Sequence, residues 1–175
     1  MEWYNIVLEL IDLRSFSNLW YWIALAVFWS TASHWGLGVP HDMVTRARKK
    51  GGQAELDLQD MVRINTNRLL YISQVSGLWI LALSCFLLTI LGVLGFYYWI
   101  EFAQALFLLL FPMSFVGLLS LSTARLIVQE QATGDALYRR LTRHRIITQI
   151  VGIASIFVTS LFGMYQNMSI GGLGA

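Results

Sequence analysis

The sequence predicts an all-α integral membrane protein, an antiparallel bundle of four transmembrane helices with an amino-terminal interfacial helix and cytoplasmic helix extensions. Hydrophobic residues make up 57% of the 175 residues and charged residues only 13%, against roughly 25% charged in an average soluble domain. Four stretches contain no Asp, Glu, Lys or Arg, and each is long enough to cross a bilayer core once. These uncharged stretches are residues 15–41, 69–100, 102–124 and 146–175.

The elements follow in order from the apolar spacing. Trp3, Val7 and Leu10 recur at near-helical spacing with acidic residues among them, which predicts an interfacial amphipathic helix over residues 1–16. Transmembrane spans are expected at about residues 19–38, 71–97, 101–125 and 146–168. All of them belong to a single membrane domain over residues 1–175, because the remainder is too short for a separate soluble domain.

The inner connections also read as helical. Pro40 suits the first turn of a short basic helix that ends at Gly51-Gly52. An apolar stripe from Ala54 to Leu69 runs straight into the second span, so that helix is expected to begin well inside the cytoplasm. Pro112 removes one backbone hydrogen bond within the third span and predicts a kink there.

The Lys and Arg residues set the orientation. Eleven of the 12 follow the first or the third span, and only Arg14 lies elsewhere. Short loops rich in basic residues stay in the cytoplasm, so both termini are expected on the outer side. Aromatic clusters at residues 20–22 and 97–99 fall at the outer interface, where Trp and Tyr are favoured.

Few residues in the spans suggest chemistry. Glu101 begins the third span, where a carboxylate suits the positive end of the helix dipole, and a proton or cation site is the weaker interpretation. His34, His41 and His144 all fall near the inner interface, so hydrogen bonding explains them better than haem or metal ligation. The single cysteine, Cys85, cannot supply a thiolate cluster. We therefore expect no catalytic residue, no metal and no cofactor.

Two basic clusters are the candidate interaction sites. They comprise Arg46, Arg48, Lys49 and Lys50 in the first and Arg139, Arg140, Arg143 and Arg145 in the second. Fixing the topology explains them without any ligand. The alternatives are anionic lipid and an acidic surface of a partner protein, whereas nucleic acid is disfavoured because no base-reading motif accompanies the charge.

Small residues within the spans mark surfaces where helices can approach closely. They are Ser73, Gly77, Gly92, Gly95, Gly117, Gly152 and Gly163. Such surfaces serve either packing within this chain or contact with another integral membrane protein. Packing within the chain is the more economical interpretation.

Four segments resemble small bacterial membrane proteins known by the description "component of SufBCD complex". The segments are Arg14–Ala26, Ser30–Trp35, Gly51–Ala54 and Ile156–Leu161. The resemblance implies a place in the bacterial cytoplasmic membrane and a link to iron–sulfur cluster assembly. It also suggests an accessory subunit of a photosynthetic or respiratory membrane complex.

These observations favour a non-enzymatic accessory subunit or assembly factor that lies in the lipid bilayer and binds other membrane proteins. The alternative is a small four-helix transporter or channel. A pair of charges at mid-membrane depth would have favoured the transporter, because such charges are tolerated there only for a purpose.

Overall fold

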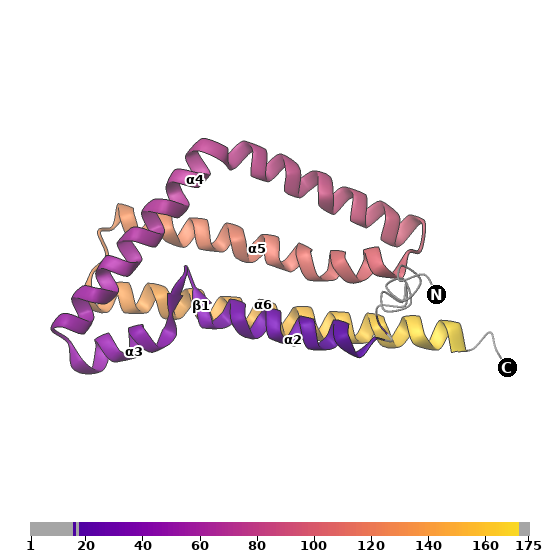
Figure 1. Ribbon diagram of the computed structural model, residues 1–175, viewed down its shortest axis with the longest axis horizontal. Coiled ribbons are helices and arrows are strands. Elements are labelled where there is room, and N and C mark those ends of the chain that lie inside the picture. Colours follow the sequence, from indigo (N-terminus) through magenta and orange to yellow (C-terminus); the bar gives the residue numbers. More distant parts are fainter. Residues whose placement is uncertain (1–15, 17, 172–175) are drawn as a thin grey trace, which may run out of the picture.

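The structure is a computed structural model, and it describes residue 16 and residues 18–171. Within these residues the chain forms five α-helices, a short β-hairpin and a π-helical turn (Figure 1). The elements are α2 (Leu19–His34), β1 (Trp35–Gly36), β2 (Val39–Pro40), α3 (His41–Lys50), α4 (Gln53–Gly92), η2 (Val93–Tyr97), α5 (Glu101–Gln129) and α6 (Gly134–Gly171). Apart from Phe16, the interfacial helix expected over residues 1–16 lies outside the described residues.

Three helical stretches are long and apolar enough to cross a membrane: Gln53–Tyr97, Glu101–Gln129 and Gly134–Met168. They indicate a multi-pass membrane protein and confirm the all-α class. The predicted number of four spans is corrected to three, because the first expected span, residues 19–38, forms a helix of only 16 residues. That helix is about 24 Å long at 1.5 Å per residue, shorter than the roughly 30 Å hydrocarbon core.

Both ends of α2 have a local cause. The side chain of Asn18 caps the start by accepting a hydrogen bond of 3.0 Å from the Trp20 amide, as N-cap residues do. At the other end, β1 pairs with β2 in antiparallel register. Leu37 and Gly38 join the two strands with φ of 57° and 73°. This hairpin ends the helix before residue 38.

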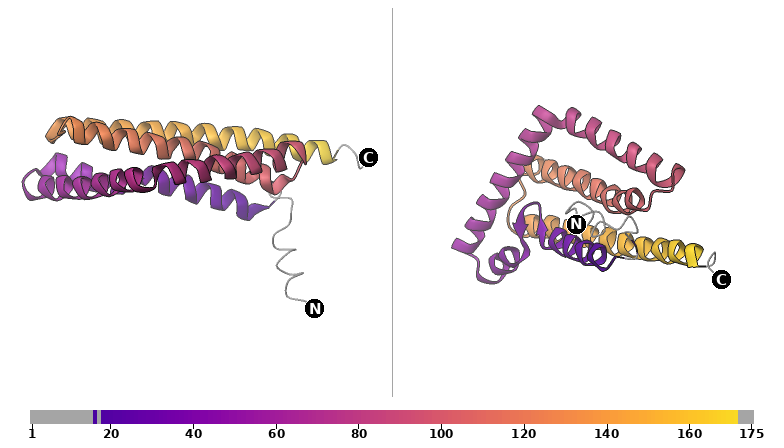
Figure 2. Two further views of the ribbon diagram at one scale, coloured as in Figure 1. Left: turned by 90° about the horizontal axis from the view of Figure 1, so that it is seen from above. Right: turned by 45° about the vertical axis from the view of Figure 1, so that its right-hand side comes forward.

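The short helix α2 lies along α6 (Figures 1 and 2). A Cβ atom added at Gly152 would lie 2.9 Å from the ring of Trp29, and one at Gly163 would lie 3.3 Å from the ring of Trp22. The two helices are therefore in contact over about three turns. Glycine at both positions lets the aromatic rings of α2 reach the backbone of α6.

The predicted basic helix is confirmed as α3. Pro40 precedes its first residue, and Gly51 ends it with φ of 59°. The left-handed conformation continues at Gly52, with φ of 54°, which glycine adopts without the steric cost of a Cβ. The chain thereby reverses directly into α4.

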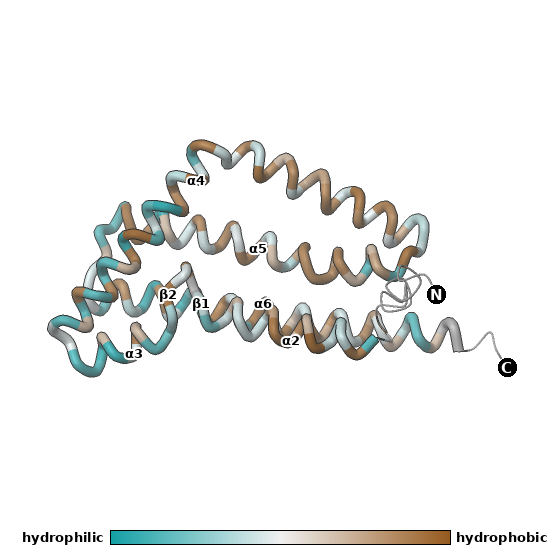
Figure 3. Tube along the Cα trace, in the orientation of Figure 1, coloured by the Kyte–Doolittle hydropathy of each residue, from teal (hydrophilic) through white to brown (hydrophobic). Residues whose placement is uncertain are grey.

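As predicted, the helix that contains the second span begins well before the apolar segment. It is α4, which starts at Gln53. Figure 1 shows it bending near its middle, and Figure 3 shows hydrophilic residues before the bend and hydrophobic residues after it. The middle of this 45-residue helical stretch contains the pair Ser76-Gly77, and such Ser/Gly pairs are common kink sites. Pro112, where a kink was predicted, does not interrupt α5, which continues as one helix through this residue.

The described part of the chain forms two hydrophobic cores. One lies where α3, the first half of α4, the end of α5 and the start of α6 meet and bury Val44, Leu58, Ile127 and Leu137. We call this the inner end of the molecule, because its basic residues predict that it faces the cytoplasm. The other joins α2, α5 and α6 around Leu25, Trp29 and Val116. The apolar half of α4 contributes buried residues to neither, because none of the residues in its most apolar 18-residue stretch is buried.

Candidate binding surfaces at the inner end and along α4

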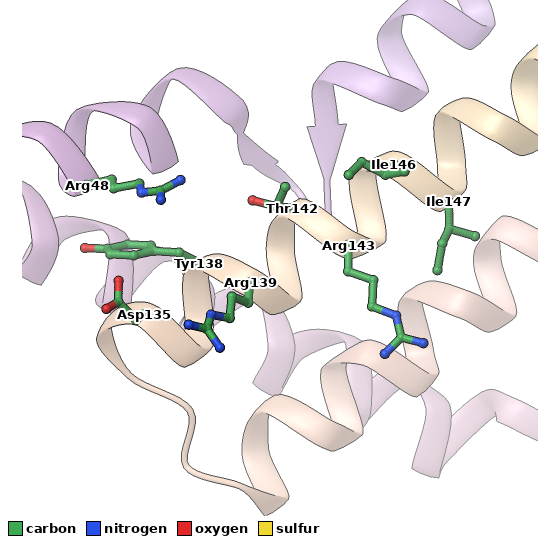
Figure 4. Close-up of a pocket in the computed structure, with 8 residues that line it drawn as sticks. All are labelled: Arg48, Asp135, Tyr138, Arg139, Thr142, Arg143, Ile146 and Ile147. Atoms are coloured by element: carbon green, nitrogen blue, oxygen red, sulfur yellow. The ribbon is translucent and has the colours of Figure 1, made fainter.

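The basic residues predicted as interaction sites gather at the inner end of the molecule, on α3 and on the first turns of α6. In Figure 3 this is the end where hydrophilic residues collect. The fold brings residues from both clusters to one cleft of about 390 Å³ (Figure 4). The cleft is lined by Arg48, Asp135, Tyr138, Arg139, Thr142, Arg143, Ile146 and Ile147.

The helical repeat of α6 explains the lining. Tyr138, Thr142 and Ile146 are four residues apart and form one ridge, and Arg139 and Arg143 form the next. Figure 4 shows these side chains along successive turns of α6, with Arg48 reaching in from α3. A second hollow, of about 460 Å³, lies between α3 and the first ridge. It shares Arg48, Tyr138 and Thr142 with the cleft and adds His41, Val44, Thr45 and Lys49.

Ion pairs divide the basic residues into two groups. Arg140 binds both carboxylate oxygens of Glu130 across the loop between α5 and α6, and Arg46 lies 3.6 Å from Asp42 on its own helix. Arg48, Arg139 and Arg143 form no salt bridge in the part of the chain that the structure describes, because no carboxylate oxygen lies within 4.0 Å of their guanidinium nitrogen atoms. The cleft is thus lined by cations that the fold leaves unneutralised.

Arg145 has a different environment from the other basic residues. Its Nε atom is buried without a hydrogen-bond partner among the described residues. Burial lowers the pKa of His41 below its usual value of 6.5, and the charges of Arg145 and His34 lower this pKa further against the opposing effect of Asp42. Arg145 therefore acts within the junction of α3 and α6 rather than at the open surface.

The histidines lie near the end of the molecule that carries the basic clusters. The buried His144 has its Nε2 atom 3.0 Å from the hydroxyl of Ser120 on α5. The rings of His34 and Trp35 make an edge contact with centroids 6.2 Å apart. In the described residues no group of three or more His, Cys, Asp or Glu side chains is placed to hold a metal ion.

Glu101 is more buried than a capping role alone requires. It occupies the first turn of α5, as predicted, and is only 8% exposed. Its carboxylate also accepts a hydrogen bond of 2.6 Å from the backbone amide of Phe16, 85 residues away. Glu101 therefore fixes the chain before α2 to the turn between α4 and α5, a contact that helical periodicity does not predict.

The structure sorts the small residues into two groups. Cβ atoms added at Gly92, Gly95, Gly152 and Gly163 would meet side chains or backbone of other elements within 4 Å. At Gly117 an added Cβ would meet nothing, and at Gly77 it would meet only Ser73 of the same helix. The first four therefore serve packing within the chain, as favoured from sequence, whereas Gly77 and Gly117 do not.

Gly77 and Gly117 face a common apolar groove of about 440 Å³ between α4 and α5. It is lined by Leu69, Ile72, Ser73, Gly77, Ile80, Leu81, Ser84, Cys85, Leu88, Ser114, Gly117, Leu118 and Leu121. At the outer end the helices converge, because Gln104 of α5 donates a hydrogen bond of 2.8 Å to the carbonyl of Gly95. Ser73 and Gly77 on α4 and Gly117 on α5 were the sequence signal for this groove, but the sequence did not indicate that they line one common hollow.

The described chain thus offers two distinct surfaces to other molecules. The inner cleft between α3 and α6 is cationic, whereas the groove between α4 and α5 is apolar and has small residues on both walls. A comparison of the chain with known protein families, with curated proteins and with solved structures finds no match.

Proposed function

We propose that this protein is a non-enzymatic integral membrane subunit or assembly factor, and that it binds another membrane protein by receiving a transmembrane helix in the groove between α4 and α5. The observation that carries the proposal is the apolar half of α4, which is long enough to cross the membrane yet buries none of its residues in its own fold. The resemblance in sequence suggests that the partner belongs to a photosynthetic or respiratory complex or to iron–sulfur assembly.

A helix fits this groove better than lipid chains alone. Apolar side chains gain little by leaving lipid, so helices associate in membranes through close packing and interhelical hydrogen bonds. Both walls of the groove provide for this, with Gly77 and Ser84 on α4 and Ser114 and Gly117 on α5. On α4 the lining runs from Leu69 to Leu88, about 28 Å at 1.5 Å per residue, which is close to the hydrocarbon thickness.

The orientation belongs to the same proposal. The protein lies in the bacterial cytoplasmic membrane with the basic end in the cytoplasm. In this orientation α4 crosses the membrane from the cytoplasm to the outer side and α5 returns to the cytoplasm. The last helix, α6, then ends on the outer side. The contact between Phe16 and Glu101 brings the chain before α2 to the same outer end. The short α2 then runs along α6 from the outer to the inner end, in addition to the three long spans, and both termini are periplasmic.

Site-specific photocrosslinking in native membranes tests the proposal. A photoreactive amino acid at Ile80 or Leu118, which line the groove, should capture one protein of fixed mass. The same group at Leu78, which is 83% exposed and does not line the groove, should not capture it. Gly117→Leu should lower capture at Ile80 by at least about tenfold, or roughly 1.4 kcal/mol, because it fills the groove where an added Cβ meets open space.

A matched control uses Ala82→Leu, which places the same leucine side chain at an exposed position of α4 outside the groove, and should leave capture unchanged. Three outcomes would contradict the proposal. A product of twice the chain's own mass would show a second copy in the groove. Capture that is equal at Leu78 would show nonspecific contact. Crosslinks to lipid alone would leave the transporter or channel as the better interpretation.

A further inference from the structure

We infer that the inner cleft binds the headgroup of an anionic phospholipid, with the acyl chains lying along α6. Arg48, Arg139 and Arg143 would contact the phosphate. This inference goes beyond the proposed function and stands on a different surface, formed by α3 and α6 instead of α4 and α5.

The lining of the cleft carries an excess of positive charge. Three arginines but only one acidic residue, Asp135, line the cleft, and the adjoining hollow adds Lys49. Guanidinium groups bind phosphate oxygens in pairs, with favourable geometry as well as charge. Because the described residues provide no salt-bridge partner for Arg48, Arg139 or Arg143, a phosphate would not have to displace one.

Neutral hydrogen-bond donors accompany the arginines in the cleft. The hydroxyl groups of Tyr138 and Thr142 belong to residues that line both hollows. Tyr138 is also a member of the inner hydrophobic core, so its ring is held in place before a ligand arrives. Asp135 can accept a hydrogen bond from a headgroup hydroxyl, and it disfavours doubly charged phosphates relative to a singly charged phosphodiester.

An apolar surface beside the cleft favours a lipid over a soluble phosphate. Ile146 and Ile147 line the apolar side of the cleft. From Ile146 an exposed apolar ridge continues along α6 through Ile150, Ile153 and Phe157, whose exposed fractions lie between 50% and 70%. These residues are spaced four, three and four apart and so share one helix face. The headgroup cleft therefore opens directly onto a surface suited to acyl chains.

Native mass spectrometry of the purified full-length protein in detergent tests the inference. Phosphatidylglycerol should bind at least about tenfold more tightly than phosphatidylcholine of the same chain length. The triple variant Arg48→Gln, Arg139→Gln, Arg143→Gln should lose this preference. Glycerol phosphate, which carries the phosphate without acyl chains, should not displace the lipid.

The matched control is Arg46→Gln, Arg63→Gln, Arg68→Gln, which removes the same charge from the inner end but lies outside the cleft. It should change the affinity by less than about threefold, or 0.65 kcal/mol. Arg143→Gln alone, at an exposed position, provides a milder variant if the triple variant does not fold.

Several outcomes would overturn the inference. An equal loss of lipid affinity in the control variant would show that the lipid is attracted by the net charge of this end and not bound at a specific site. Displacement by glycerol phosphate would assign the cleft to a soluble phosphate compound. Unchanged lipid affinity in the triple variant, together with loss of a co-purifying protein, would assign it to an acidic protein surface.

Discussion

Gly152 and Gly117 are both glycines in apolar membrane helices, yet their surroundings differ. The ring of Trp29, only 4% exposed, packs against Gly152, where an added Cβ would approach to 2.9 Å. At Gly117 an added Cβ would contact nothing within 4 Å. The same residue type therefore has opposite roles, close packing within the chain in one case and an open wall in the other.

Substitution at these two glycines should separate the roles. Gly152→Ala should destabilise the fold by about 1–3 kcal/mol, because overpacking forces Trp29 or the backbone to move. Gly117→Ala should instead leave stability unchanged or raise it by up to about 1 kcal/mol, because no steric contact opposes the higher helix propensity of alanine. Unfolding in detergent, followed by tryptophan fluorescence, measures both, and equal effects would contradict the packing of α2 against α6.

At the scale of elements, each long helix has an inner and an apolar half with different partners. The inner halves of α4 and α6 meet α3 and the end of α5 in a core that resembles that of a soluble protein. Further along, α6 packs with α2 and α5, whereas α4 bends away (Figure 1). The inner core therefore positions the helices, and the bend determines which apolar surface is left for a partner.

The junction of α3 with α6 should be sensitive to pH through His41. Its lowered pKa, caused by burial first and then by Arg145 and His34, means that the folded state binds this proton less readily than the unfolded chain. The stabilisation is therefore present above the usual pKa of 6.5 and is lost as the pH falls below that value. Acidification should loosen the inner end of the molecule.

Thermal unfolding of the wild type and of His41→Asn at about pH 7.5 and about pH 5.5 measures this effect. The wild type should lose more stability between the two pH values than the variant, which cannot gain the proton. Arg145→Gln should reduce the wild-type loss, because it removes one cause of the lowered pKa. An equal loss in all three proteins would show that His41 does not respond to pH in this way.

At the scale of the whole molecule, charge and aromatic residues separate along the helix axes. The basic residues of α3 and the first turns of α6 lie at one end, and Tyr97, Tyr98 and Trp99, each at least 60% exposed, lie at the turn between α4 and α5 at the other. Cytoplasmic loops carry the excess of Lys and Arg. This polarity predicts the orientation in the membrane.

Cysteine labelling tests that orientation in intact cells. In a Cys85→Ser background, a single cysteine introduced at Tyr98 should react with a membrane-impermeant thiol reagent, whereas one at Gln53 should react only after the cells are opened. Both positions are exposed, so a difference reports the side of the membrane. The reverse pattern would invert the proposed topology and place the cationic cleft outside.

Local structure followed from the sequence. The boundaries of α3 at Pro40 and Gly51, the start of α4 well before its apolar part and the start of α5 at Glu101 were all predicted and are all present. Each depends on contacts within a few residues, such as a restricted φ or a 3.6-residue apolar period. The gathering of basic residues at the inner end followed from their positions between the spans.

Only the tertiary structure decided which surfaces are closed and which are open. Lipid-facing and core-facing residues are equally apolar in a membrane protein, so hydropathy could not distinguish Gly152, covered by Trp29, from the open Gly117. The early end of α2 depends on the pairing of Trp35 with Pro40, which overrides an apolar run that was long enough to span. Whether an arginine is neutralised, like Arg140 by Glu130, depends on how loops and helices meet, and that information lies beyond any local pattern.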